Sequence, residues 1–404
     1  MNTSISDRLN RIQPSPTSAI TDRARQLRAI GQDVISLSQG EPDFETPEHI
    51  KAAAEQAIRD GHTRYTVVDG IPELKQAVCR KFKSENNLDY QPSEITVSSG
   101  CKQLLFNALM ATLNRGDEVI IPAPYWVSYS AMVEIADGCP IIIPCAAEQQ
   151  FKLTPDKLES AVTSATRWLI LNSPSNPTGA VYTRTELLAL AEVLLQHPEV
   201  LVITDDIYEH LIYGDVEFTT LAQVEPRLKE RTLTCNGMSK AYCMTGWRIG
   251  FAGGPESLIR AMAKLQSQSS FHPASICQHA AVAGLNGGRD FLVPQLLAYH
   301  ERRDTLVLEL NRIDGITCPV PDGAFYVFPS CTGLFGRLAP NGQTLASDTD
   351  VVSYFLDTAE VALVPGRAFG FPGHFRVSYA TDIDTLLSAC ERIQLACEKL
   401  TETD

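Results

Sequence analysis

Between residues 94 and 254, short apolar runs alternate with segments of helical spacing, and this alternation constrains the fold more than any other feature. Uninterrupted apolar runs separated by helices are typical of a mostly parallel sheet that is covered on both faces. We therefore predict an α/β fold whose large domain contains a mostly parallel seven-stranded sheet. The predicted strands are 94–98, 118–121, 140–144, 168–172, 200–204, 231–235 and 248–252.

The sequence on either side of this region predicts a second, smaller α+β unit and an N-terminal arm. At 404 residues the chain exceeds the usual length of one domain. We predict an arm and part of the small domain at 1–46, the large domain at 47–300 and a small C-terminal domain at 301–404. Residues 1–16 are expected to have little structure. The further predicted elements are strands at 33–38, 323–328, 361–366 and 375–379, and helices at 21–29, 47–60, from Pro72 onward, 275–285, 291–312, 349–360 and 382–400.

Composition and charge exclude several classes of protein. The chain is 44% hydrophobic and 20% charged, as ordinary globular proteins are, and its net charge of −14 argues against nucleic acid or an anionic membrane as a partner. Its eleven cysteines have no CxxC or Cys/His spacing, so we predict reduced thiols, no metal site and a cytoplasmic location. No apolar run reaches membrane-spanning length, and residues 1–11 lack the apolar core of a signal peptide.

The residues that follow the predicted strands are the candidate ligand-binding residues, because ligands of open α/β sheets bind beyond the carboxyl ends of the strands. A glycine turn at 98–103 precedes a helix, which indicates an anion site. Aromatic residues at 122–129 could stack on a flat ligand or pack in the core. A rigid polar loop follows at 172–179, and paired acids and a tyrosine occupy 203–210. Buried carboxylates need a partner, and a cationic ring nitrogen is a suitable one.

Lys240 lies between two strand-like runs, at a junction where its side chain would be held in place. A lysine in a cleft of low dielectric loses pKa and becomes a nucleophile, so Schiff-base chemistry with a carbonyl or with pyridoxal phosphate is one interpretation. A surface lysine is the other. Arg248 offers a planar fork of donors for a phosphate or a carboxylate, and Arg376 lies unusually within a strand-like run. Gly40 either lets the backbone approach a ligand or forms a plain turn.

Taken together, these motifs resemble the class I aminotransferases, which are fold-type I pyridoxal-phosphate enzymes. The motifs occur in the family's order and cover nearly the whole chain. They are SGCKQ at 99–103, PYW at 124–126, NSPSNPTG at 172–179, DDIY at 205–208, SKA at 239–241, GWRIG at 246–250 and FRVSYA at 375–380. The sequence is most similar to the bacterial aspartate aminotransferase subgroup that also contains prephenate aminotransferases.

The resemblance implies that the large domain binds pyridoxal 5′-phosphate and that Lys240 carries it as a Schiff base and shuttles the substrate proton. Asp205 would pair with the ring nitrogen, which keeps the ring an electron sink, and Tyr208 with Asn176 would bind the phenolic oxygen. Trp126 would stack on the ring. The remaining implied cofactor residues are Gly100, Cys101, Lys102, Ser239 and Arg248, together with Tyr65 from the other subunit of a homodimer.

For the substrate, the resemblance implies that Arg376, Gly40, Asn176 and Trp126 bind the amino acid, and that Lys102 contacts the distal carboxylate of an acidic one. It implies an aspartate aminotransferase that uses 2-oxoglutarate in a ping-pong mechanism. Thr17 matches a threonine linked to prephenate use. Gly237 stands where the family usually has a serine, and Phe271 with His272 replaces small polar residues in a segment that reaches the partner's pocket.

Three alternatives stay open. A prephenate-specific or broad aromatic aminotransferase is the first, since Phe271 adds apolar surface near the substrate. A C–S lyase or decarboxylase of the same fold is the second, although the residues that bind α-carboxylate and distal carboxylate are both present. A cofactor-binding transcription regulator is the third, and no basic DNA-binding module precedes Asp33 to favour it.

Overall fold

The computed structural model describes residues 5–14 and 16–402, and its main sheet has seven strands in the order β2-β8-β7-β6-β5-β3-β4. Six of them run parallel, and β8 is antiparallel to both of its neighbours. All seven predicted strands are therefore confirmed. Their bounds are β2 Ile95–Ser98, β3 Glu118–Ala123, β4 Cys139–Pro144, β5 Thr166–Asn172, β6 Leu201–Asp205, β7 Thr232–Gly237 and β8 Gly250–Gly253.

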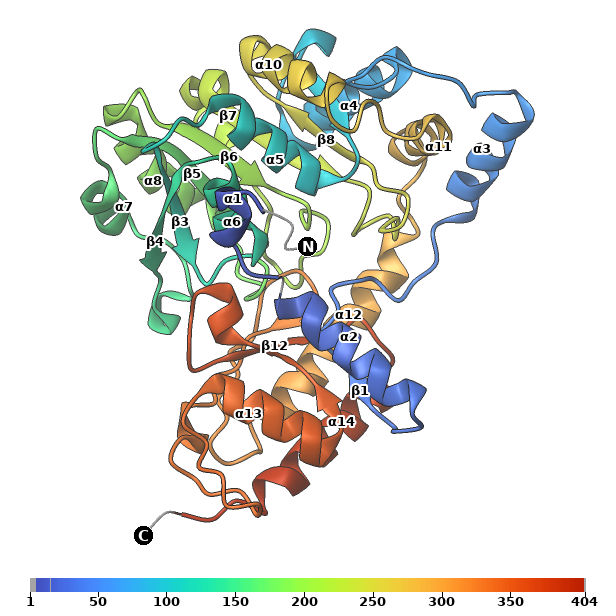
Figure 1. Ribbon diagram of the computed structural model, residues 1–404. Helices are drawn as coiled ribbons and strands as arrows, with labels where there is room; N and C mark the ends of the chain where they lie inside the picture. Colours follow the sequence, from blue (N-terminus) through green and yellow to red (C-terminus); the bar gives the residue numbers. More distant parts are fainter. Residues whose placement is uncertain (1–4, 15, 403–404) are drawn as a thin grey trace.

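Successive residues of the sheet face opposite cores, because side chains alternate along a strand. Trp168 and Ile170 of β5 pack with helices α5 (Cys101–Thr112) and α10 (Glu256–Ser267), whereas Leu169 and Leu171 pack with α8 (Arg184–Gln196). Figure 1 shows α5 and α10 on one side of the sheet and α8 on the other. Both faces are thus covered, which explains the uninterrupted apolar runs of the sequence.

The register of the central strands brings their carboxyl ends together. Asn172, the last residue of β5, pairs with Asp205, the last residue of β6, and Asp205 pairs with Cys235 of β7. The segments that follow these strands therefore leave the sheet at one edge, as the sequence predicted.

A second group of elements packs beyond this edge. Strand β1 (Ile35–Ser36) pairs with β10 (Val361–Ala362), and β12 (Phe375–Ser378) lies between β11 (Val364–Pro365) and β9 (Tyr326–Val327). Helices α2 (Pro16–Ala29), α13 (Asp348–Tyr354) and α14 (Ile383–Cys397) surround these strands, and α12 (Leu292–Leu310) runs from the main sheet to them (Figure 1). Because α12 passes through position 300, the division at 1–46, 47–300 and 301–404 stays a prediction.

The remaining helices match the helical segments of the sequence or fill the connections between strands. They are α1 (Asp7–Asn10), α3 (Glu48–Arg59), α4 (Pro72–Asn86), α6 (Ser128–Ile135), α7 (Pro155–Ala161), α9 (Leu221–Val224) and α11 (Ser275–Asn286). Within the described part of the chain, no helix is both long and apolar enough to cross a membrane.

The expectation of little structure before residue 16 was wrong in part. Helix α1 forms there and packs beside α6, where Arg11 Nη2 donates to Asp137 Oδ1 at 2.5 Å. Helix α2 begins at Pro16 rather than at residue 21, because proline is well tolerated in the first turn of a helix. Residues 1–4 and 15 of this prediction lie outside the described residues.

Four predicted elements of the small unit differ from the expectation. The strand predicted at 361–366 is divided into β10 and β11, because the two pieces pair in different sheets. The strand predicted at 33–38 is only Ile35–Ser36, because its partner β10 has two residues. The strand predicted at 323–328 is only Tyr326–Val327, because Ala324 has a left-handed backbone with φ of 59°. The helix predicted at 349–360 changes at Phe355 into a π-helical turn that ends at Ala359.

Candidate active site

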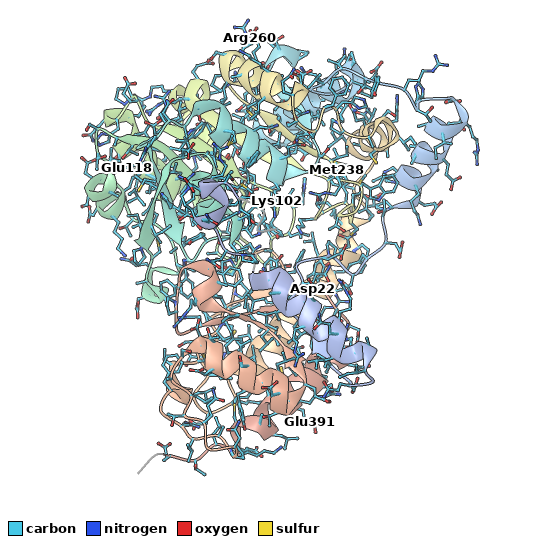
Figure 2. All side chains as sticks on the ribbon, in the orientation of Figure 1. Asp22, Lys102, Glu118, Met238, Arg260 and Glu391 are labelled. Atoms are coloured by element: carbon cyan, nitrogen blue, oxygen red, sulfur yellow. The ribbon has the colours of Figure 1, made fainter. Side chains whose placement is uncertain are left out.

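A cavity of ≈ 330 Å³ lies where the carboxyl ends of β5 and β6 meet the start of α5 and the small sheets. Eleven of the predicted site residues line it, although they come from seven separate parts of the sequence. They are Gly40, Cys101, Lys102, Trp126, Asn176, Asp205, Tyr208, Ser239, Lys240, Arg248 and Arg376. Figure 2 labels Lys102 at the end of α5 that points toward α2. The sequence motifs therefore converge on one site.

Lys240 follows β7 and extends its amine into this cavity. Its Nζ donates to the Gly40 carbonyl at 2.6 Å and lies 5.8 Å from the ring centres of Tyr208 and Phe325. Removal from water, and then the positive charge of Arg376, lower the pKa of Lys240 to about 8. About a tenth of this amine is thus unprotonated at pH 7, far more than for an ordinary lysine, and the unprotonated form is the one that a nucleophile requires.

Asp205 ends β6 as a buried carboxylate that accepts two side-chain hydrogen bonds. Tyr129 Oη donates to Oδ2 at 2.6 Å, and Cys101 Sγ donates to Oδ1 at 3.4 Å. Burial raises the pKa of Asp205, and the two donors oppose that rise because they stabilise the anion. The carboxylate is held in one orientation, and it is suited to a cationic partner within the cavity.

Tyr129 was missed by the sequence analysis as a site residue. It lies on the first turn of α6 and is fully enclosed, and its ring packs edge-on against Trp126 at 5.4 Å. Trp126 lies just before α6, and Tyr129 N donates to the Trp126 carbonyl at 3.0 Å, so the turn that starts this helix brings the two rings together. Tyr129 thus supports both the Trp126 ring and the Asp205 carboxylate.

Tyr326 of β9 is a second missed residue, and it borders the cavity opposite Lys240. Its hydroxyl hydrogen-bonds to the Tyr208 hydroxyl at 2.9 Å. A Cβ atom at Gly40 would stand 2.1 Å from the Tyr326 hydroxyl, so only glycine fits at position 40. The backbone at Gly40 therefore approaches the Tyr326 side chain closely, and its approach to a ligand stays a prediction.

Arg376 of β12 is buried with only part of its guanidinium satisfied. Nη1 donates to Asn176 Oδ1 at 2.9 Å, Nη2 donates to the Ser38 carbonyl, and Nε has no hydrogen-bond partner in the described part of the chain. Burial lowers the pKa of Arg376. An enclosed guanidinium with a spare donor is a site for a carboxylate, which accepts paired N–H groups.

An anion site is formed by Arg248 and the start of α5. Arg248 has a left-handed backbone with φ of 56°, a costly conformation for arginine, and its Nη1 donates to the Thr245 carbonyl at 2.9 Å. Gly100 has φ of 86°, and a Cβ there would stand 2.3 Å from Arg248 Nη2. Its N–H donates to the Ser98 carbonyl, so the free amides of this turn belong to Cys101 and Lys102.

The structure explains the glycine at position 237 and shows where Lys102 and Thr17 lie. A Cβ atom at Gly237 would lie 2.8 Å from the Ile249 carbonyl, so a serine would not fit there without a backbone shift. Lys102 Nζ lies 4.7 Å from the centre of the Trp126 ring, and partial removal from water, then Arg248, lower its pKa. Thr17 lines the same cavity.

Two predicted site residues, Gly100 and Tyr65, do not line the cavity; Gly100 adjoins Cys101, which does, whereas Tyr65 is not next to a lining residue. Tyr65 is 87% exposed, and its ring packs edge-on against Phe271 at 5.4 Å and His272 at 5.7 Å. None of these three is among the residues that line the cavity. Any role for them in a site requires a second copy of the chain.

The residues of the cavity fit pyridoxal 5′-phosphate. A phosphate matches the cationic turn of Arg248 and the free α5 amides, a protonated ring nitrogen matches Asp205, and an aldehyde matches the amine of Lys240. The spare Nε of Arg376 matches the carboxylate of an amino acid.

Comparison with known proteins identifies the family of this chain over nearly its full length. The family model described as aminotransferase class I and II matches residues 32–393. The chain is 56% identical over 396 residues to the aspartate/prephenate aminotransferase of Cereibacter sphaeroides, covering 98% of this chain and 99% of that one. It is similar to the crystal structure of the aspartate aminotransferase from Rhizobium meliloti, with a TM-score of 0.97, 52% identity and coverage of 99% and 100%. For the aspartate aminotransferase from Thermus thermophilus with maleate, the TM-score is 0.91, the identity 41% and the coverage 98% and 100%.

Proposed function

This chain belongs to the aminotransferase class I and II family, and from that premise we propose that it moves the amino group of L-aspartate, or a similar acidic amino acid, to 2-oxoglutarate. It is a transaminase with the α/β fold of the fold-type I enzymes. The proposal includes a ping-pong mechanism and pyridoxal 5′-phosphate as the cofactor.

The single observation that supports an acidic substrate is that two cationic side chains besides Arg248 line the cavity around Lys240. These are Arg376, which is suited to an α-carboxylate, and Lys102, whose ammonium lies over Trp126. A substrate with two carboxylates satisfies both charges. The Thermus relative carries maleate, a dicarboxylate, in its structure, and this supports the assignment.

The cofactor, when bound, supplies an electron sink for charge at the substrate α-carbon. We assign Lys240 to hold it through the amine and Asp205 to hold its ring nitrogen protonated. Tyr208 and Asn176 would donate to its phenolic oxygen, and Trp126 would pack on its ring. The assigned phosphate residues are Gly100, Cys101, Lys102, Ser239 and Arg248, of which Gly100 acts by making room for Arg248.

At the substrate, Arg376 and Asn176 bind and orient the α-carboxylate, and Gly40 leaves room for it. The free amine of Lys240 would take the proton from the substrate α-carbon, and the ammonium that results would hold this proton for its return. A pKa of about 8 suits this task, because a group that both accepts and donates works best near the ambient pH.

Prephenate is the second candidate substrate. Thr17 lines the cavity, and the Cereibacter relative is named for both aspartate and prephenate. Phe271 and His272 would add apolar surface if they reach the partner's cavity. A C–S lyase is disfavoured, since Arg376 and Lys102 both line the site.

We expect Lys102→Ala to lower kcat/KM for aspartate, glutamate and prephenate far more than for alanine or phenylalanine. Only the acidic substrates would leave a carboxylate without its cation, which costs roughly 2 kcal/mol or more, or about 30-fold. The measurement is kcat/KM for each amino donor. Lys83→Ala, which removes an exposed lysine outside the cavity, is the control. An equal loss for all donors would assign the Lys102 side chain, and not only its backbone amide, to the phosphate, or to the fold.

We also propose a homodimer with shared active sites, in which the partner subunit's Tyr65 completes the phosphate site. The observation behind this is that Tyr65 is exposed and does not line the cavity of its own chain. Such sharing is expected of a closed twofold assembly.

If sites are shared, mixing inactive Lys240→Ala and Tyr65→Ala proteins should restore activity. A mixed dimer then contains one complete site, so equal amounts should give roughly one quarter of wild-type activity after random exchange. Mixing Lys240→Ala with Arg248→Ala is the control and should restore none, because both residues line the cavity of one chain. Absence of recovery after verified subunit exchange would refute sharing.

The proposed location is the cytoplasm. All eleven cysteines are free, and several of them are buried, as expected of a protein from a reducing compartment. Amino acids and keto acids are the proposed small-molecule partners.

A further inference from the structure

The turn that presents Asp205 and Tyr208 to the cavity is connected on its far side to a buried ion pair. Glu209 follows Tyr208 directly and is 6% exposed, and Lys81 of α4 is 3% exposed. Neither residue lines the cavity. The mechanism therefore has no direct use for this pair, although burying two charges is costly.

Each charge of this pair is satisfied by more than one partner. Lys81 Nζ forms an ion pair with Glu209 Oε1 and donates to Asn86 Oδ1 at 2.7 Å. Asn86 Nδ2 in turn donates to Glu209 Oε2 at 2.9 Å. Burial alone would raise the pKa of Glu209, but Lys81 and then His210 lower it, so the carboxylate is ionised. The three side chains form a closed ring of contacts between α4 and the turn after β6.

A metal ion is not needed to explain the cluster. Glu85, Glu209 and His210 have ligand atoms within 4.8 Å of one another, a spacing that a metal site would have. Positive charge is already supplied there by Lys81, and by Arg289, whose Nη1 lies 2.9 Å from Glu85 Oε2. The amine of Lys81 serves as the cation of this site.

The backbone of the turn is held on both sides of this pair, since Asp206 N donates to the Cys235 carbonyl at 2.9 Å and Leu211 N donates to the Tyr208 carbonyl at 2.8 Å. The turn contains no regular helix, and the Tyr208 side chain is tied through its hydroxyl to Tyr326 alone among the described residues. Glu209 N donates to the Asp206 carbonyl at 2.9 Å, so a displacement of Glu209 would be transmitted to the residues on either side of Tyr208.

We propose that Glu209, anchored by Lys81 and Asn86, is a positioning residue that fixes the Tyr208 hydroxyl toward the cofactor. This inference rests on the proposed function, in which Tyr208 binds the phenolic oxygen. Loss of the anchor leaves a buried charge unpaired, and the turn must move to let water reach it. Tyr208 then loses its alignment while its own chemistry is intact.

The test is the pH titration of the absorbance of bound pyridoxal phosphate, together with its dissociation constant. Tyr208→Phe sets the reference, since removal of a donor to the phenolic oxygen raises the apparent pKa of the bound cofactor. We expect Glu209→Gln to raise that pKa in the same direction, by about one unit, which is a tenfold change in protonation ratio. The double variant Tyr208→Phe/Glu209→Gln should shift no further than Tyr208→Phe alone.

Lys75→Met is the matched control. Lys75 is also on α4 and forms a mostly buried pair with Asp69 at 2.6 Å, but this pair touches no residue of the turn. The Lys75→Met variant should have a lower melting temperature than the wild type but the same apparent pKa of the bound cofactor. If Glu209→Gln fails to fold, Lys81→Met/Glu209→Met replaces it, because apolar pairs often substitute for buried ion pairs.

The outcomes separate this inference from the function on which it rests. A wild-type protein that gives no titrating absorbance with pyridoxal phosphate refutes the proposed function. A normal wild-type titration, with both Glu209 variants matching Lys75→Met, refutes the positioning role. An additive shift in the double variant also refutes it, because Glu209 would then act independently of Tyr208.

Discussion

Lys240→Ala should abolish transamination while the protein still binds pyridoxal phosphate. The phosphate, ring and ring-nitrogen contacts assigned to Arg248, Trp126 and Asp205 do not involve the amine, so the cofactor keeps its place. The proton transfer at the substrate α-carbon loses its carrier, and loss of a positioned acid–base group alone costs roughly 10²–10⁴-fold. The covalent step is lost as well, so turnover should fall below detection.

Two measurements check this result. Dialysed variant protein should retain cofactor, with the absorbance of the free aldehyde in place of that of the lysine-linked form. Lys264→Ala, which removes an exposed lysine of α10, should behave like the wild type. If the Lys240→Ala spectrum stays that of the wild type, another lysine carries the cofactor.

The pH dependence of stability gives an independent test of the lowered pKa of the Lys240 amine. The pKa of Lys240 is about 8 in the folded protein and 10.5 in its ordinary state. Between these values Lys240 binds a proton in the unfolded chain that it does not bind in the native chain, so its contribution to the stability of the cofactor-free protein should rise with pH in this window. Buried thiols such as Cys145 and Cys390, whose pKa values are raised, contribute in the opposite direction. Lys240→Ala should lose the rise contributed by Lys240, as measured by denaturant unfolding across the window.

The sheet and most of the site could be predicted because both depend on local sequence. Each strand of the sheet is a continuous apolar run, and the residues after β5, β6 and β7 had to meet at one edge once the strands were parallel. Lys240, Asp205 and Asn176 were therefore found from their positions at strand ends. Their chemical roles came from the resemblance and are proposals about residues whose convergence is now observed.

The residues that were missed depend on long-range packing, which has no local signal. Tyr326 reaches the Tyr208 hydroxyl from 118 positions away, and Lys81 reaches Glu209 from α4. The strand at 323–328 was overpredicted because its apolar pattern hides the left-handed Ala324. The structure of one chain does not test the role predicted for Tyr65, because that role is in the site of the other subunit of a homodimer.

Arg376→Lys should lower kcat/KM for every amino donor, because the α-carboxylate is common to all of them. The guanidinium already donates to Asn176 and Ser38 from opposite arms, and it has a spare donor at Nε for the substrate. A lysine has a single ammonium and cannot reproduce a planar fork. Loss of a bidentate charged pair costs roughly 2–4 kcal/mol of transition-state binding, or about 30- to 1,000-fold.

The control for Arg376→Lys is Arg303→Lys, since Arg303 is also buried but donates to the Pro321 carbonyl and does not line the cavity. The two variants should lose comparable stability, and only Arg376→Lys should lose kcat/KM. The loss should be uniform across aspartate, glutamate, alanine and phenylalanine, in contrast to the selective loss expected for Lys102→Ala. A loss confined to the acidic donors would place the distal carboxylate at Arg376, and the substrate would then lie in the cavity in the reverse orientation.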